Sequence, residues 1–140
     1  VVITPTDATR PAASTEASGF WQSLGANVLS MTPAKHDAAL AATSHLPHLV
    51  AVALAASTPA EFLPLTASGW RDTTRIAGAD AKIWQPIFAA NCESVLDAID
   101  VFSQTLAGLR ESLEQGDYET LVATLEAAAK KKRDRDALGD

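Results

Sequence analysis

The chain has 140 residues, the length of one ordinary domain, and its 47% hydrophobic and 20% charged residues are typical of a globular protein. A chain of this size is expected to bury roughly two-thirds of its unfolded surface. The net charge of −6 argues against a nucleic acid partner. The single cysteine, Cys92, excludes an internal disulfide and suits a reducing cytoplasm, where we expect the protein to lie. We find neither a signal peptide nor an apolar run of about 20 residues.

The N-terminal part of the chain predicts a short β-α-β unit. A strand over residues 1–4 stops at Pro5, a helix over residues 11–24 ends at Gly25, and a second strand covers residues 27–31. Two strands do not form a stable sheet by themselves. We therefore expect residues 1–32 to be the C-terminal remnant of a Rossmann-type nucleotide-binding domain. The chain also lacks an initiator methionine, so we interpret it as a fragment.

Residues 33–140 predict an almost wholly helical domain, so the fold class is mainly α. Thr32 and Pro33 are suited to the cap and first turn of a helix. Pro47 should kink or split the apolar stretch 38–56 near Ser44. Shorter helices are expected after residues 57–59 and over residues 70–77, with Gly69 as an interruption, and Asp80 can cap the next helix.

A long helix carries the clearest periodicity in the sequence. Its apolar residues alternate in steps of four and three, which is typical of a helix seam that packs against another helix: Phe88, Cys92, Val95, Ile99, Phe102, Leu106, Leu109 and Leu113. A helix of about 28 residues spans about 40 Å, more than the core of such a domain needs. We therefore expect part of the seam to pair with a second chain, and Cys92 to be an inert packing residue.

The chain ends in a final helix. Gly116 should end the long helix, and Asp117 should cap this last one. The basic run 130–133 lies among acidic residues, and we interpret it as a solvated helix end rather than a phosphate-binding patch.

His45 and His48 are three residues apart in an apolar helical stretch, so both project from one face. Three interpretations compete. In the first, both are hydrogen-bonded core histidines; in the second, both bind a metal; in the third, both hold a ligand at the kink made by Pro47. The metal site needs a third ligand, and His36 is the only other histidine, without zinc-like spacing. We therefore predict no metal.

A second polar segment follows Gly69. Arg75 lies three residues after Asp72, close enough to pair with it on a helix, and Trp84 follows nine residues later. One interpretation is a weak surface salt bridge. The other is that the guanidinium of Arg75 binds a carboxylate, with Asp72 orienting it and Trp84 shielding the pair from water.

Read together, these segments resemble the prephenate/arogenate dehydrogenase family of tyrosine biosynthesis. The resemblance covers most of the chain, in matching order and spacing: residues 1–6, Phe20-Trp21, residues 24–26, residues 31–33, His36-Asp37, Ser44-His45-Leu46-Pro47-His48, residues 69–77, Trp84 and Asn91. It matches only the back half of such an enzyme. It implies a helical dimerisation and substrate-binding domain over residues 33–140, preceded by the tail of the nucleotide-binding domain over residues 1–32.

The resemblance also implies roles for particular residues. Ser44 and His48 would line the pocket for prephenate or arogenate, with His45 beside them. Arg75 would bind the substrate carboxylate, reaching toward a neighbouring subunit's site. Asp72 and Trp84 would gate access. The family often has a run of glycines where this chain reads Ala67-Ser68-Gly69. Ser68 would narrow the pocket or add a hydrogen bond, which leaves the choice between prephenate and arogenate open.

The resemblance implies NAD- or NADP-dependent oxidative decarboxylation by the intact protein, acting as a homodimer. The family's catalytic histidine and glycine-rich cofactor motif lie upstream of residue 1, and no Gly-x-Gly-x-x-Gly occurs here. We therefore expect no catalytic residue, no bound cofactor and no turnover in this chain alone. Two alternatives remain: the helical domain of a different NAD(P)-dependent dehydrogenase, and a non-enzymatic helical dimer that senses a small aromatic acid.

Overall fold

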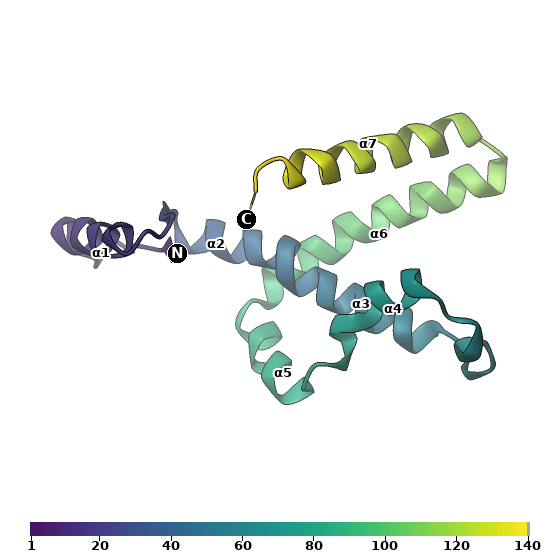
Figure 1. Cartoon of the computed structure of the whole chain (residues 1–140), viewed down its shortest axis with the longest axis horizontal. Helices are drawn as coiled ribbons and strands as arrows, with labels where there is room; N and C mark the ends of the chain where they lie inside the picture. The colour runs from purple at the N-terminus through teal and green to yellow at the C-terminus, as the bar shows by residue number, and fades with distance from the viewer. Residues whose placement is uncertain (140) are drawn as a thin grey trace. The chain divides into compact units, whose positions relative to one another are not determined.

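The computed structural model describes residues 1–139, which are predominantly helical (Figure 1). The chain divides into two compact units, residues 1–98 and the part that begins at Ile99. Helix α6, Cys92–Gln115, runs from the first unit into the second. The mainly α fold class is therefore confirmed, with one short sheet near the N-terminus.

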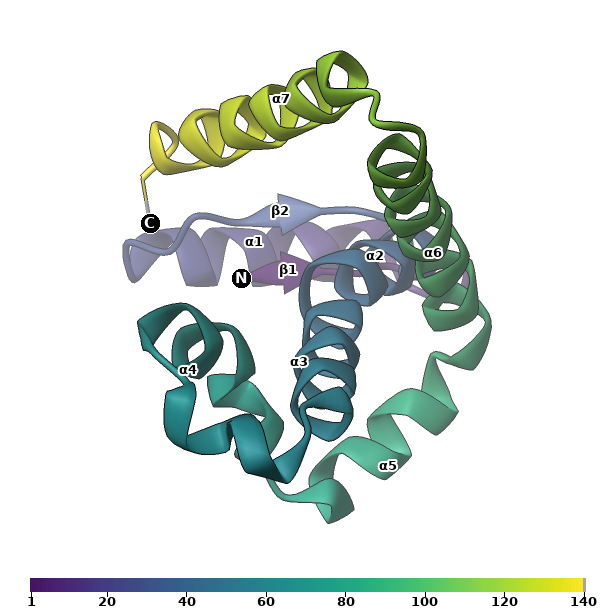
Figure 2. The ribbon, with the colours of Figure 1, turned by 90° about the vertical axis from the view of Figure 1, so that its right-hand side faces the viewer.

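The predicted β-α-β unit is present. Strands β1, Val2–Ile3, and β2, Leu29–Ser30, pair in parallel, with Val2 opposite Leu29, and helix α1, Pro11–Ser23, connects them (Figure 2). Gly25 has a φ of 81°, and the N–H of Ala26 donates to the carbonyl of Trp21 over 3.1 Å. This pattern is a Schellman motif, which satisfies the last carbonyls of α1 and requires the glycine.

The helix that follows is continuous from Pro33 to Ser57 but changes its winding once. Helix α2, Pro33–Leu40, is capped by the Thr32 hydroxyl, which accepts from the Lys35 N–H over 3.2 Å. A π-helical turn, η1 (Ala41–His45), then leads into α3, Leu46–Ser57. The sequence predicted a kink or split near Ser44. Instead the turn widens there, which accommodates the missing N–H and the ring of Pro47 without ending the helix.

This continuous helix corrects the expectation that no segment is long and apolar enough to cross a membrane. The helix Pro33–Ser57 has 25 residues and is long and apolar enough to cross a membrane, although it contains charged and imidazole side chains. The core helix of a globular protein passes the same test. Here His45, His48 and Ala51 are buried by protein, so one face of the helix is a packing surface.

Three short helical segments follow, and two of them contact α3. They are η2, Ala60–Leu65, α4, Ser68–Thr74, and η3, Arg75–Gly78; α4 and η3 contact α3. Gly69 lies inside α4 rather than interrupting it, contrary to expectation. The indole N–H of Trp70 donates to the Thr58 hydroxyl over 2.9 Å, which ties α4 to the end of α3.

The predicted long helix is two helices. Helix α5, Ala81–Ala90, is capped by Asp80 and ends at Asn91, where φ is −125° and ψ is 32°. Helix α6 begins at the next residue. Phe88 thus belongs to α5, and the seam over α6 starts only at Cys92, whose side chain is exposed rather than packed. The side-chain hydrogen bonds of Asn91 explain the break, as described below.

The second unit is a helical hairpin. Gly116, with a φ of 67°, ends α6, and the Asp117 carboxylate accepts from the Thr120 N–H over 3.0 Å at the start of α7, Tyr118–Asp136 (Figure 1). In the basic run, Lys130 pairs with Asp134 and Lys132 with Asp136 at 2.5 and 2.6 Å, one helical turn apart. These exposed pairs agree with a solvated helix end.

The chain buries less surface than its length predicts. Its accessible area is 10,473 Å², whereas a compact monomer of this mass exposes roughly 6,900 Å² and the unfolded chain roughly 21,000 Å². About half of the surface is buried, not two-thirds, and the buried apolar side chains among residues 1–139 are Ala41, Ala51 and Val95. The reason is that α1, α6 and α7 leave large apolar side chains on their surfaces, including Phe20, Leu106, Leu113 and Val122.

Candidate functional site

Two buried imidazoles form the centre of the candidate site. His45 lies at the end of the π turn and His48 in the first turn of α3, and both are buried. The ring of His48 stacks on the indole of Trp84, with centroids 3.7 Å apart and planes 9° apart. The ring of His45 stands edge-on to Trp84 and Phe88, at 6.3 Å from each. Helix α5 therefore supplies an aromatic wall for both histidines.

Asn91 connects this cluster to the preceding helix. Its amide nitrogen donates to the carbonyl oxygen of Asp37 over 2.8 Å and contacts the Nδ1 atom of His45 at 3.2 Å. These bonds span 54 and 46 residues of sequence, and they hold the junction of α5 and α6 against α2 and the π turn. The break in the predicted long helix thus serves a tertiary contact.

His48 carries an unsatisfied polar atom. Its Nδ1 atom is buried and has no hydrogen-bond partner in the part of the chain that the structure describes. An unpaired buried polar group costs about 1–3 kcal/mol. Burial also lowers the pKa of His48, because desolvation disfavours the imidazolium. The neutral ring is therefore favoured, and its Nδ1 atom could still accept or donate a hydrogen bond if a partner reached it.

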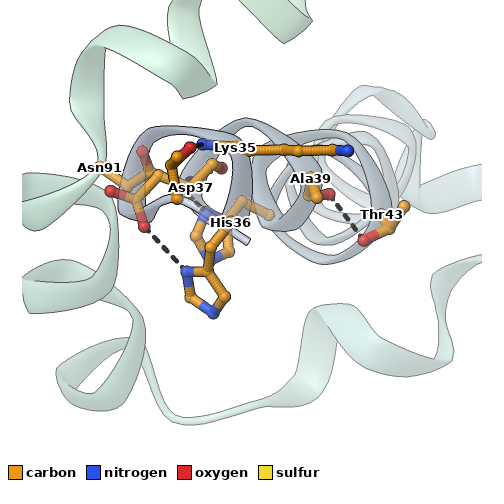
Figure 3. A network of polar contacts seen from close by, with 8 residues as sticks. Lys35, His36, Asp37, Ala39, Thr43 and Asn91 are labelled. Carbon is orange, nitrogen blue, oxygen red and sulfur yellow. Dashed lines mark hydrogen bonds and ion pairs between the residues drawn. The ribbon is translucent and has the colours of Figure 1, made fainter. Parts of the chain in front are cut away.

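A polar pair lies on the same helix, one turn before the π segment. Nδ1 of His36 is 2.9 Å from Oδ1 of Asp37, and both residues are half-buried (Figure 3). The carbonyl of Asp37 is the atom that accepts from Asn91, whose position beside this turn Figure 3 shows. His36 is thus engaged locally. Among residues 1–139, no three His, Cys, Asp or Glu side chains gather as a metal site would require.

The arginine segment lies on α4 and η3. Arg71 donates to the carbonyl of Thr66 over 3.4 Å, whereas in the described part of the chain nothing pairs with the exposed guanidinium of Arg75. The expected ion pair between Asp72 and Arg75 does not form. The helix changes from α to 3₁₀ winding between them, with Thr74 at a φ of −92° and a ψ of −2°, which alters the three-residue spacing.

The structure brings some predicted residues together and leaves others apart. His45, His48 and Trp84 form one cluster, so Trp84 covers an imidazole rather than an Arg75–Asp72 pair. Ser44 is half-buried in the same π turn. Ser68 and Gly69 are exposed at the start of α4. Because η3 packs on α3, Arg75 belongs to the segment next to the helix that carries His48.

Two residues of the cluster were missed as site residues. Phe88 was interpreted as part of the helix seam, and Asn91 was noted only within the resemblance. The sequence offered one usable signal for Asn91: a polar residue between two apolar helical stretches, with an amide that can satisfy a buried histidine. No local pattern relates it to residues about fifty positions earlier.

Comparison with known proteins agrees with this architecture. Residues 32–127 match the family described as prephenate dehydrogenase, dimerization domain. Cyclohexadienyl dehydrogenase of Zymomonas mobilis is 32% identical over 129 residues, which are 84% of this chain and 43% of that protein. Prephenate dehydrogenase of Bacillus subtilis is 31% identical over 133 residues, 91% of this chain and 36% of that protein.

Solved structures give the same result. The prephenate dehydrogenase of A. aeolicus, in complex with hydroxyphenyl propionate and NAD+, superposes with a TM-score of 0.85 at 33% identity, over 95% of this chain and 49% of that one. Synechocystis arogenate dehydrogenase superposes with a TM-score of 0.83 at 28% identity, over 98% and 51%. This chain spans about half the length of these proteins, or less. It belongs to the prephenate dehydrogenase family, and its residues 32–127 match the dimerization domain of that family.

Proposed function

We propose that this chain supplies substrate binding and dimerisation to an NAD(P)-dependent dehydrogenase that converts prephenate to 4-hydroxyphenylpyruvate, or arogenate to tyrosine. In this reaction the ring carbon that bears the hydroxyl gives a hydride to the nicotinamide. The ring carboxylate leaves as carbon dioxide, and the ring becomes a phenol. The names of the relatives and the bound hydroxyphenyl propionate of the A. aeolicus enzyme support this substrate class.

One observation carries the proposal: two buried imidazoles adjoin a segment that carries the Arg75 guanidinium, and neither this guanidinium nor Nδ1 of His48 has a partner among residues 1–139. In this arrangement Arg75 binds a substrate carboxylate through two parallel hydrogen bonds. Ser44, His45 and His48 bind the rest of the substrate, Ser68 and Gly69 border it, and Asp72 and Trp84 control access. The aromatic wall of α5 suits a six-membered ring that becomes aromatic.

The cofactor belongs elsewhere in the intact enzyme. Strands β1 and β2 have two residues each, and α1 begins at Pro11, after Arg10, without a glycine-rich turn. This supports a dinucleotide phosphate site outside these residues. We assign no hydride-transfer step to residues of this chain. Residues 1–32 are then the tail of the nucleotide-binding domain and residues 33–140 the helical domain, in a cytoplasmic enzyme that uses NAD or NADP.

Dimerisation is supported by the exposed apolar residues of α6 and α7. Leu106 and Leu113 on α6, and Val122 and Leu125 on α7, are each about half exposed. Each large apolar side chain that becomes buried contributes about 1.5–3 kcal/mol. A second copy related by a two-fold axis would cover these residues with its own.

Product analysis on the intact enzyme tests the proposal. With prephenate or arogenate and each cofactor, we expect reduced nicotinamide, carbon dioxide and the matching phenol to form in equal amounts. Oxidation of a different acid, with these two inert, would indicate another dehydrogenase of the same build. Binding of an aromatic acid without any turnover would favour the sensor alternative.

A further inference from the structure

The amide of Asn91 has only one orientation that satisfies its neighbours. The atom that faces the carbonyl oxygen of Asp37 at 2.8 Å must be the nitrogen, because a carbonyl oxygen accepts and does not donate. The same nitrogen lies 3.2 Å from Nδ1 of His45. The two hydrogens of the amide are therefore directed at these two acceptors.

This orientation determines the tautomer of His45. Since the Asn91 amide donates to Nδ1, that ring nitrogen cannot itself carry a hydrogen. A neutral imidazole then has its hydrogen on Nε2. Within residues 1–139 no protein acceptor takes this Nε2–H, and the ring is held edge-on to Trp84 and Phe88. His45 thus presents a donor whose direction is fixed by its neighbours.

We propose that Asn91 is a positioning residue that locks His45 as the Nε2–H tautomer, so that the site favours a ligand with an acceptor oxygen facing His45. A carboxylate or carbonyl oxygen fits this requirement, whereas an amine at that position would meet a second donor. The ligand part of the inference rests on the proposed function; the tautomer part does not. Asn91 touches His45 and not the ligand, so it acts through the imidazole.

Nuclear magnetic resonance of the ¹⁵N-histidine-labelled chain tests the tautomer directly. His36→Gln and His48→Gln assign the three ring systems. In the unsubstituted chain at neutral pH, we expect His45 to show a protonated Nε2 and an unprotonated Nδ1. Asn91→Ala should give a mixture of tautomers, and Asn91→Asp should move the hydrogen to Nδ1, where the carboxylate accepts it. Asn27→Ala, which changes the other asparagine, is the matched control and should leave the pattern unchanged.

An Nδ1–H pattern in the unsubstituted chain would overturn the tautomer assignment, and the same Nε2–H pattern in Asn91→Ala would overturn the positioning role of Asn91. If neither Asn91 variant folds, the pattern of the unsubstituted chain still decides the tautomer. Calorimetry with hydroxyphenyl propionate tests the ligand part, and Asn91→Ala should weaken binding about tenfold, the effect of one misplaced hydrogen bond. An altered tautomer with unchanged affinity would refute the ligand part alone. No binding by the unsubstituted chain would count against the proposed function and leave the tautomer result standing.

Discussion

The indole of Trp84 lies face to face with the imidazole of His48, with ring centroids 3.7 Å apart and planes 9° apart. This stack closes one side of His48, and its buried Nδ1 atom has no hydrogen-bond partner within the described residues. The two residues come from helices α5 and α3, so this ring contact helps to join the elements that border the candidate site. Changes in either residue should therefore affect both stability and ligand binding.

The chain should lose stability in mildly acidic solution through His48. Because burial lowers the pKa of His48 in the folded chain, the unfolded chain binds more protons as the pH falls. This contribution is absent above the ordinary histidine pKa of about 6.5 and grows as the pH drops below it. Urea unfolding at about pH 7.5 and about pH 5.5 should show the difference. His48→Phe, which keeps a flat ring on Trp84, should reduce the pH dependence; an unchanged dependence would contradict the assignment.

Removing the indole should destabilise the chain more than its partial exposure suggests. Trp84→Ala deletes the stack on His48 and the contact with Phe88, and we expect a loss of about 3 kcal/mol, the lower end for buried tryptophans. Trp84→Phe keeps a stacking ring and should cost less than about 1.5 kcal/mol. Trp21→Ala, at a more exposed site, is the control and should cost under about 1 kcal/mol. Equal losses at both tryptophans would mean that the stack is not stabilising.

Arg75 should matter for substrate affinity in the intact enzyme. A bidentate guanidinium–carboxylate contact contributes about 1.5–3 kcal/mol, so Arg75→Ala should raise KM roughly tenfold to a few hundredfold. The turnover number should fall less, since the arginine holds substrate and transition state alike. Arg75→Lys should rescue only in part. Arg71→Ala is the matched control, because Arg71 is engaged with the Thr66 carbonyl. A KM within about twofold of the parent would make Arg75 an ordinary surface residue.

The exposed residues of α6 should hold two copies together. Leu106→Asp places a charge in the expected interface, so sedimentation at micromolar concentration should show a dimer for the unsubstituted chain and a monomer for the variant. Leu65→Asp changes an equally apolar and more exposed residue on η2, and it should leave the dimer intact. A monomeric parent chain would remove the basis of the prediction.

The sequence predicted those parts of the fold that depend on local chemistry. Thr32, Asp80 and Asp117 cap helices as expected, and Gly25 and Gly116 adopt positive φ at helix ends. These residues interact with neighbours only a few positions away, so their spacing in the sequence is sufficient to predict where the helices begin and end. The mainly helical class and the family follow from the same kind of signal, repeated along the chain.

What the sequence did not predict depends on distant partners. The four-three spacing of apolar residues from Phe88 onward predicts one helix. A break between two helices cannot be seen in this spacing when the same spacing continues on both sides of the break. Asn91 breaks it by bonding to the Asp37 carbonyl and to His45, on an element far away in sequence. The expected Asp72–Arg75 pair failed for a related reason: η3 packs on α3 and winds as a 3₁₀ helix there.

The π turn between α2 and α3 has a consequence for the phase of the whole helix. An α-helix turns about 100° per residue, so the extra residue in the wide turn rotates everything after Leu46 by about that angle relative to what precedes Ala41. Deleting one residue from this turn would restore a regular helix with all its backbone hydrogen bonds. It would also turn either the Asp37 half or the His48 half away from α5. The inserted residue thus adds nothing to the helix itself and sets the direction in which its two halves face.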